Sequence, residues 1–252
     1  MIQDNPQPRF LFRNKVQRLR LNNKFTKCVT IIMKTKITKD SRNLLIALLL
    51  GDGTISNNFV FKLSHGIQQT EYLQWKIKQL NDAGLKNNGL KTYISTCGYN
   101  TGSSVVYSQL SVIPFIKLLR RIIYKPKKVL GNRKLLNRLD AKGIAIWYMD
   151  DGHINIRKTA GRIHGFYIKI ATCLSKEENQ IIIDYFKEVW DISFYQFSEG
   201  KGTYSICCGT KEGIKFIEIV KPYVSQIPSM TYKIHYDLSQ RMYQVDNNKL
   251  LI

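Results

Sequence analysis

Two segments of the 252-residue chain share one pattern, an apolar run that ends in an acid and a glycine. They are residues 45–53 and 144–152, and their acids, Asp52 and Asp151, are 99 positions apart. A carboxylate at the C-terminal end of a helix is repelled by the helix dipole. Two such acids at a domain-length spacing indicate a positive group between them. A divalent cation is the simplest candidate, because hard cations bind carboxylate and carbonyl oxygens.

One copy of this pattern alone would be read as a buried helix or strand that enters a turn. The second copy favours a functional interpretation of the pair. Ala47 and Gly51 are four residues apart, so one face of the first helix carries small side chains that let another backbone approach closely. The pattern therefore predicts two helices that pack against each other.

The charge of the chain limits its partners. It has 39 Lys and Arg residues against 18 Asp and Glu residues, a net charge of +21. A surface this basic favours nucleic acid or an anionic membrane. No apolar run approaches the roughly 20 residues that a membrane span needs, so we expect no membrane partner. The five cysteines show no Cys-x-x-Cys spacing, which indicates reduced thiols in an intracellular compartment rather than a zinc site.

The two segments resemble the paired motifs of single-chain LAGLIDADG homing endonucleases, and the resemblance covers about residues 40–239. It implies an α+β fold of two pseudo-symmetric αββαββα halves, with saddle-shaped antiparallel sheets and the motif helices packed at the interface. The sequence departs from the motif at its first acid position, which is Leu50 in one copy and Met149 in the other. Ile146 is larger than the residue expected at a close helix contact.

The chain divides into a basic N-terminal extension (1–37), a first half (38–138) and a second half (139–252). Asp40 or Ser41 is a candidate N-cap for the first motif helix, which we expect to end near Gly51. Hydrophobic periodicity predicts the same order of elements in both halves. In the first half these are a strand at 58–64, a helix at 71–83, strands at 90–96 and 104–111, and a helix at 114–123. In the second they are a strand at 162–172, a helix at 175–190, strands at 192–197 and 203–208, and a helix at 211–220.

Residues 1–36 carry nine Lys and Arg residues and one acid, Asp4. This composition fits an organellar transit peptide, an arm that lies on DNA, or read-through sequence ahead of an internal start at Met33. The sequence does not choose among these three.

The resemblance implies that Asp52 and Asp151 are the metal-binding catalytic carboxylates, with the backbone carbonyls of Gly51 and Asp150 as further ligands. The cofactor would be Mg²⁺. Mn²⁺ would substitute for it, and Ca²⁺ would support binding without cleavage.

Two lysines complete the catalytic set. Lys128 and Lys233 each follow the last helix of their half and match the lysines found there in monomeric members of the family. A basic group near the acids would polarise water or neutralise the developing charge. Lys127 is an alternative to Lys128.

Outward-facing strand residues are the candidates for DNA contact. Basic, amide and hydroxyl side chains on a β-ribbon can read base edges in the major groove. The halves differ at nearly every such position, so we expect an asymmetric target of about 20 base pairs, bound far better than unrelated DNA. The candidates are Lys62, Ser64, Lys91, Tyr93, Tyr167, Lys169, Gln196 and Tyr204.

The leading hypothesis is a monomeric, intron-encoded endonuclease that makes a staggered double-strand break in DNA and so promotes intron mobility. Its alternatives are an RNA maturase, which would bind the host intron RNA, and a non-cleaving DNA-binding regulator. A protein-splicing element is disfavoured because the sequence starts with Met1 and ends Leu251-Ile252. We expect a mitochondrial or chloroplast protein, with a bacterial or phage origin as the alternative.

Overall fold

The structure is a computed structural model, which describes residues 37–96, 101–125, 127–160 and 162–236. Residues 1–36 of the predicted N-terminal extension lie outside this part of the chain, as does part of the segment between the strands predicted at 90–96 and 104–111. No helix in the described part of the chain has the length and apolar character to cross a lipid bilayer.

The same order of main elements occurs twice along the chain, apart from a short linker. The first half contains α2 (Lys39–Leu50), β1 (Thr54–Ile55), β2 (Phe61–Gly66), η1 (Ile67–Gln69), α3 (Thr70–Asp82), β3 (Lys91–Ile94), β4 (Ser104–Leu110) and α4 (Pro114–Ile123). The linker contains β5 (Tyr124–Lys125), β6 (Lys127–Lys128) and α5 (Arg133–Leu136). The second half contains α6 (Ala141–Asp151), β7 (Gly152–Thr159), β8 (Arg162–Leu174), α7 (Lys176–Trp190), β9 (Tyr195–Gly200), β10 (Thr203–Gly209), α8 (Thr210–Val224) and η2 (Pro228–Lys233).

Each half builds one four-stranded antiparallel sheet. The strand orders are β1-β2-β4-β3 and β7-β8-β10-β9, so the two sheets have equivalent topology. Helix α3 packs on the first sheet, and α7 and α8 pack on the second. Within the described residues, no helix packs on the other face of either sheet. The predicted α+β class and its pseudo-symmetric arrangement are confirmed.

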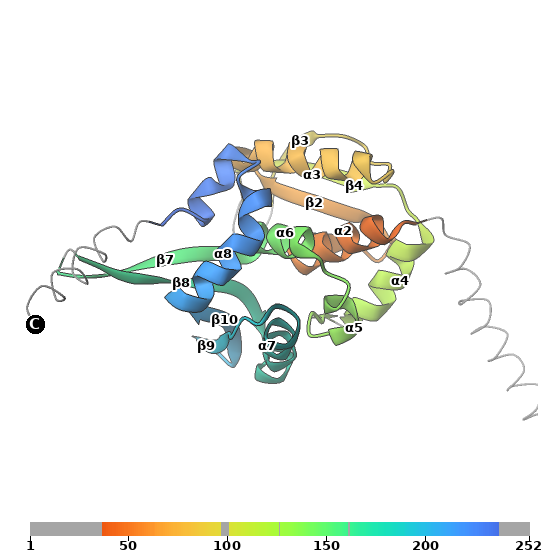
Figure 1. Ribbon diagram of the computed structural model, residues 1–252. Coiled ribbons are helices and arrows are strands. Elements are labelled where there is room, and N and C mark those ends of the chain that lie inside the picture. Colours follow the sequence, from red (N-terminus) through yellow and green to blue (C-terminus); the bar gives the residue numbers. More distant parts are fainter. Residues whose placement is uncertain (1–36, 97–100, 126, 161, 237–252) are drawn as a thin grey trace, which may run out of the picture.

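Helices α2 and α6 lie side by side at the centre of the molecule (Figure 1). They are buried almost all round, as expected for helices that pack between two sheets. A Cβ atom added to Gly143 would lie 3.5 Å from the Cβ of Ala47 and 2.7 Å from Oδ1 of Asn43. Ala47 therefore makes its predicted close contact with Gly143, which lies about one turn before Ile146. The larger side chain of Ile146 does not prevent this contact.

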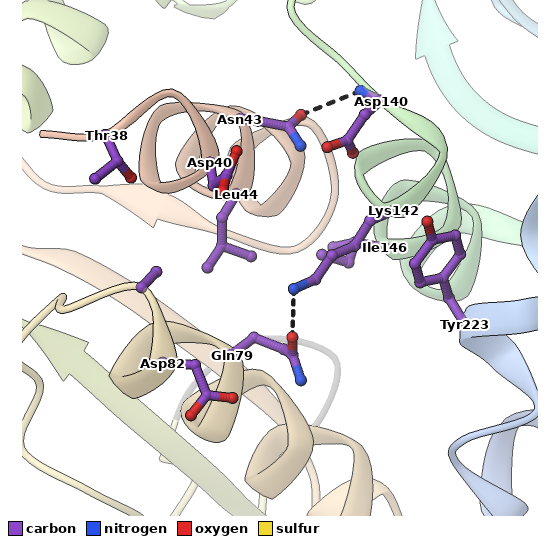
Figure 2. Close-up of a pocket in the computed structure, with 11 residues that line it drawn as sticks. Thr38, Asp40, Asn43, Leu44, Gln79, Asp82, Asp140, Lys142, Ile146 and Tyr223 are labelled. Carbon is purple, nitrogen blue, oxygen red and sulfur yellow. Dashed lines mark hydrogen bonds between the residues drawn. The ribbon is translucent and has the colours of Figure 1, made fainter.

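The N-terminal ends of these helices enclose a separate polar pocket. Figure 2 shows Asn43 of α2 pointing toward Asp140, whose backbone N–H it accepts at 3.4 Å, and Lys142 donating to Gln79 of α3. The expected N-cap of α2 is wrong by two or three residues, because Thr38 caps the helix by accepting from the N–H of Ser41. Since α2 and α6 run away from this pocket, their acids lie at the opposite end of the pair.

The sequence missed one long strand, β7. It follows α6 directly and forms a long hairpin with β8. Its isoleucines, Ile154 and Ile156, alternate with His153, Asn155 and Arg157, but the apolar motif helix before it masked this period of two.

Candidate active site

The two motif acids stand where α2 and α6 end. Asp52 follows Gly51, the C-cap of α2, and Asp151 is the last residue of α6. The Asp52 side chain is 41% exposed. Burial of its carboxyl group and repulsion from Asp150 nevertheless raise its pKa. The charged form of this carboxyl group is therefore disfavoured in the folded protein.

Asp151 has the more strongly shifted pKa. Burial, followed by repulsion from Asp150 and Asp52, raises its pKa to about 7, although Lys128 and the indole of Trp147 oppose the shift. The Trp147 N–H donates to Oδ2 of Asp151 at 3.2 Å. Mutual repulsion between Asp52 and Asp151 means that a cation between them would stabilise both charged forms.

The two predicted lysines occupy equivalent positions beside the acids. Lys128 of β6 donates to the carbonyl of Gly51 at 2.8 Å and to that of Gly53 at 3.3 Å. Lys233 of η2 donates to the carbonyls of Met149 at 2.5 Å and Asp150 at 3.3 Å.

Burial lowers the pKa of both Lys128 and Lys233. Each ammonium group lies against the backbone next to one motif acid. The side chain of Lys127, the alternative to Lys128, is outside the described part of the structure.

The side chain of Asp150 forms a buried polar cluster next to Asp52, which the sequence analysis missed. Asp150 forms an ion pair with Lys76 of α3 at 2.5 Å, and both side chains are completely buried. The hydroxyl of Tyr72 donates to Oδ1 of Asp150 at 2.8 Å, and the backbone N–H of Asp52 donates to Oδ2 at 3.0 Å. Burial would raise the pKa of Asp150, but the charge and hydrogen bond of Lys76 and the backbone N–H of Asp52 hold it below its usual value.

His65 of β2 extends this cluster. It has one ligand atom that lies within 4.8 Å of those of Asp52 and Asp150, an arrangement typical of a cation site. However, Lys76 already contacts both His65, at 3.0 Å from Nε2, and Asp150. Burial and the charge of Lys76 lower the pKa of His65 to about 4, so its imidazole is neutral at physiological pH. An ammonium group therefore supplies the positive charge here.

A signal for this cluster was present in the sequence. Tyr72, Leu73, Lys76 and Leu80 form the buried stripe of α3 at helical spacing. A lysine on the apolar stripe of an amphipathic helix requires a buried partner. The second motif, with two consecutive acids, offers one more acid than the first.

Six candidate DNA-contact residues lie on the helix-free faces of the sheets. In the first sheet, Lys62 is paired in register with Gln109 and lies 4.5 Å from the ring centre of Tyr93. In the second sheet, Lys169 forms an ion pair with Glu199 at 2.5 Å. Strand alternation places the others on the same faces, opposite the buried core residues: Ser64, Lys91, Tyr93 and Tyr167.

The expected orientation of Gln196 and Tyr204 is wrong. The amide of Gln196 donates to the carbonyl of Lys176 and to Gln180, so its side chain points to α7. Tyr204 pairs with Ser198, which is two residues from Gln196, and it shares the helix-covered face. The outer face of β9 carries Tyr195 and Phe197, which are 44% and 42% exposed.

The chain matches a known protein family over most of its length. Residues 42–216 match the model of the LAGLIDADG DNA endonuclease family. The chain belongs to this family. The match includes both motif helices and both sheets, so the LAGLIDADG chain carries two copies of the motif that names the family.

Curated relatives cover most of the LAGLIDADG chain. It is 29% identical over 205 residues to Protein RecA of Mycobacterium shimoidei, which covers 75% of this chain and 45% of that protein. It is 28% identical over 213 residues to Protein RecA of Mycolicibacterium flavescens, covering 79% and 47%. The chain thus spans about half the length of the curated relatives it matches.

A solved structure shares the fold. The homing endonuclease I-WcaI bound to its DNA recognition sequence superimposes with a TM-score of 0.66 at 21% identity, covering 81% of this chain and 90% of that one. This agreement concerns the fold, with two sheets around a central helix pair.

Proposed function

We propose that this LAGLIDADG protein is a site-specific endonuclease that cleaves both strands of a long, asymmetric DNA target by divalent-metal-dependent hydrolysis, and that it promotes the mobility of the intron that encodes it. The observation that carries the proposal is the pairing of Asp52 and Asp151 at adjacent helix ends, one beside the half-buried Lys128 and the other beside the buried Lys233. Family membership supplies the substrate class, DNA.

The residues present fit a divalent cation such as Mg²⁺. Asp52 and Asp151 offer hard carboxylate oxygens. The carbonyls of Gly51 and Asp150 accept from Lys128 and Lys233, and each carbonyl oxygen keeps a second lone pair for a cation. Burial and the neighbouring acids raise the pKa of Asp52 and of Asp151, so a bound cation would stabilise the charged form of both carboxyl groups. When bound, the metal would activate water, stabilise the negative charge on the phosphate and assist the leaving oxygen.

The chain's own groups have distinct tasks in this proposal. Asp52 and Asp151, one from each half, would hold the divalent cations. Lys128 and Lys233 supply fixed positive charge beside them, and their lowered pKa values follow from the same burial that excludes water. Because each lysine donates to the backbone next to one acid, it also fixes that acid's position.

The helix-free sheet faces would provide sequence recognition. In this proposal Lys62, Lys91 and Lys169 would reach phosphates or base edges, and the aromatic side chains near them differ in the two halves. Lys169 must break its ion pair with Glu199 to reach DNA. Glu199 would therefore weaken binding to DNA of unrelated sequence. An asymmetric protein surface favours an asymmetric target.

A binding titration tests the proposal. A duplex that spans the intronless junction of the host gene should bind at least about 10³-fold more tightly than a scrambled duplex at physiological salt. Equal affinity for the two would refute site-specific recognition and favour a nonspecific nucleic-acid binder or an RNA maturase. Repeating the titration at a second salt concentration separates phosphate contacts from base contacts, because only the former steepen the salt dependence.

Lys169→Ala refines this test. If Lys169 contacts a base edge, the substitution should weaken binding mainly at one or two positions of the target, whereas loss of a phosphate contact would weaken all sequences equally. Glu199→Gln is the matched control, since it frees Lys169 without removing it.

A further inference from the structure

The buried ion pair of Lys76 and Asp150 has no role in the function proposed above. Both side chains have no exposed surface. An ion pair buried this deeply is seldom a net source of stability, because desolvating two charges offsets most of their attraction. The pair lies next to Asp52, so a role in positioning that residue would explain it.

Asp150 links the two halves through its two carboxylate oxygens. Oδ1 accepts from Lys76 at 2.5 Å and from the hydroxyl of Tyr72 at 2.8 Å, both on α3 of the first half. Oδ2 accepts the backbone N–H of Asp52 at 3.0 Å. The carboxylate of Asp150 is therefore fixed from one side and holds the backbone of Asp52 from the other.

Gly51 makes this contact sterically possible. A Cβ atom added there would lie 2.2 Å from Oδ2 of Asp150, far inside contact distance. The backbone of residues 51–52 thus lies directly against the Asp150 carboxylate. Any side chain at position 51 would push the two apart and move Asp52.

Asp151 has no contact equivalent to the one that Asp150 makes with the backbone of Asp52. Gly51 stands in the first motif where Asp150 stands in the second, and glycine offers no side chain to the backbone of Asp151. Asp151 belongs to the last turn of α6, and its carboxylate is oriented by the indole of Trp147. The lysine contacts, in contrast, occur on both sides.

We propose that Asp150 is a positioning residue for Asp52, anchored by Lys76 and Tyr72, so that the two halves of the active site depend unequally on it. This inference rests on the proposed endonuclease function. It predicts that loss of the Asp150 side-chain acceptor slows the cleavage of one DNA strand more than that of the other.

Two neutral double variants isolate the acceptor. Asp150→Asn with Lys76→Met removes both charges but leaves an amide oxygen for the Asp52 N–H. Asp150→Leu with Lys76→Met removes both charges and the acceptor. Replacing a buried pair by groups of similar volume avoids the penalty of one unpaired charge, so both variants should fold. Tyr72 keeps a second acceptor in both, the carbonyl of Ile146 at 3.2 Å.

Strand-specific cleavage is the first readout. With each strand end-labelled in turn, the Leu variant should slow the cleavage of one strand about tenfold more than that of the other, the equivalent of one hydrogen bond. The Asn variant should cleave the strands in the wild-type ratio, whatever its overall rate. Wild-type strand ratios in both variants would overturn the inference. Failure of the wild-type protein to cleave would instead refute the proposed function.

Hydrogen exchange of the Asp52 amide is the second readout and needs no cleavage. The amide should be protected in the wild type and in the Asn variant, and should exchange about tenfold faster in the Leu variant. Equal protection in the two variants would overturn the inference even if no DNA were cut.

Discussion

Asp151→Asn should stabilise the metal-free protein at pH 8, although it removes a proposed catalytic residue. Burial and the neighbouring acids raise the pKa of Asp151 to about 7 from an ordinary 3.8. The folded state holds this proton more tightly than the unfolded state does. Protonated Asp151 therefore contributes to the unfolding free energy in full below about pH 4, and this contribution is lost as the pH rises through 7. Asparagine has no charge to bury at any pH, so the variant escapes this loss.

The pKa shift sets the size of the effect. A shift from 3.8 to about 7 corresponds to at most about 4 kcal/mol of unfolding free energy at pH 8, and residual solvent screening reduces the expected gain to about 2 kcal/mol. At pH 5 the gain should be less than half as large. Bound Mg²⁺ should diminish the gain or reverse its sign, because the wild-type carboxylate then has a partner.

Urea unfolding with EDTA at pH 5 and pH 8, and with excess Mg²⁺ at pH 8, measures these differences. The midpoint of the Asn variant should exceed that of the wild type most clearly at pH 8 in EDTA. A variant that is less stable than the wild type under that condition would refute the electrostatic account of the site.

Three further predictions follow from the packing and charge of the site. Sedimentation at micromolar concentration should give a monomer, because α2 and α6 already bury each other's contact faces, and a stable dimer would contradict this. Lys128→Met and Lys233→Met should each reduce the cleavage rate by about 10²-fold with binding retained, as for loss of one charge-stabilising donor, and unchanged rates would exclude both lysines from catalysis. Gly51→Ala should lower the unfolding free energy by about 1–3 kcal/mol, because the added Cβ would collide with Asp150. Gly66→Ala is the control and should change the unfolding free energy little, because the nearest atom to its added Cβ is the flexible end of a glutamine. Equal effects of the two substitutions would contradict the tight contact.

Much of the fold was accessible from the sequence because it depends on local patterns. The helix predicted at 114–123 has the same bounds in the structure, since Pro114 marks its first turn. The repeated apolar run ending in an acid predicted the helix pair and the two motif acids. Charge and spacing sufficed for these features.

The remaining features depend on which face of a strand is covered. We expected Gln196 to face outward on the strand predicted at 192–197. In the structure the Gln196 side chain points to α7, and Tyr195 and Phe197 are exposed on the outer face of β9. No local pattern separates a core aromatic residue from one placed beside a cationic side chain, as Phe197 is beside Lys169.

The Asp150 cluster depended on tertiary contacts. Lys76 and Asp150 are 74 positions apart and meet only because α3 packs against the end of α6. The positions of the two residues in the sequence do not indicate this contact. Each residue is unusual only within its own segment, Lys76 on the apolar stripe of α3 and Asp150 directly before the motif acid Asp151.

Cleavage of a supercoiled plasmid that contains the intronless junction, by the wild-type protein and by Asp52→Asn in Mg²⁺, tests the central claim most directly. If the two motif acids form one metal-dependent site, the wild type will linearise the plasmid. Asp52→Asn will yield no linear product while its affinity for the junction stays within tenfold, about 1.4 kcal/mol. Linear product at the wild-type rate from Asp52→Asn would contradict the claim.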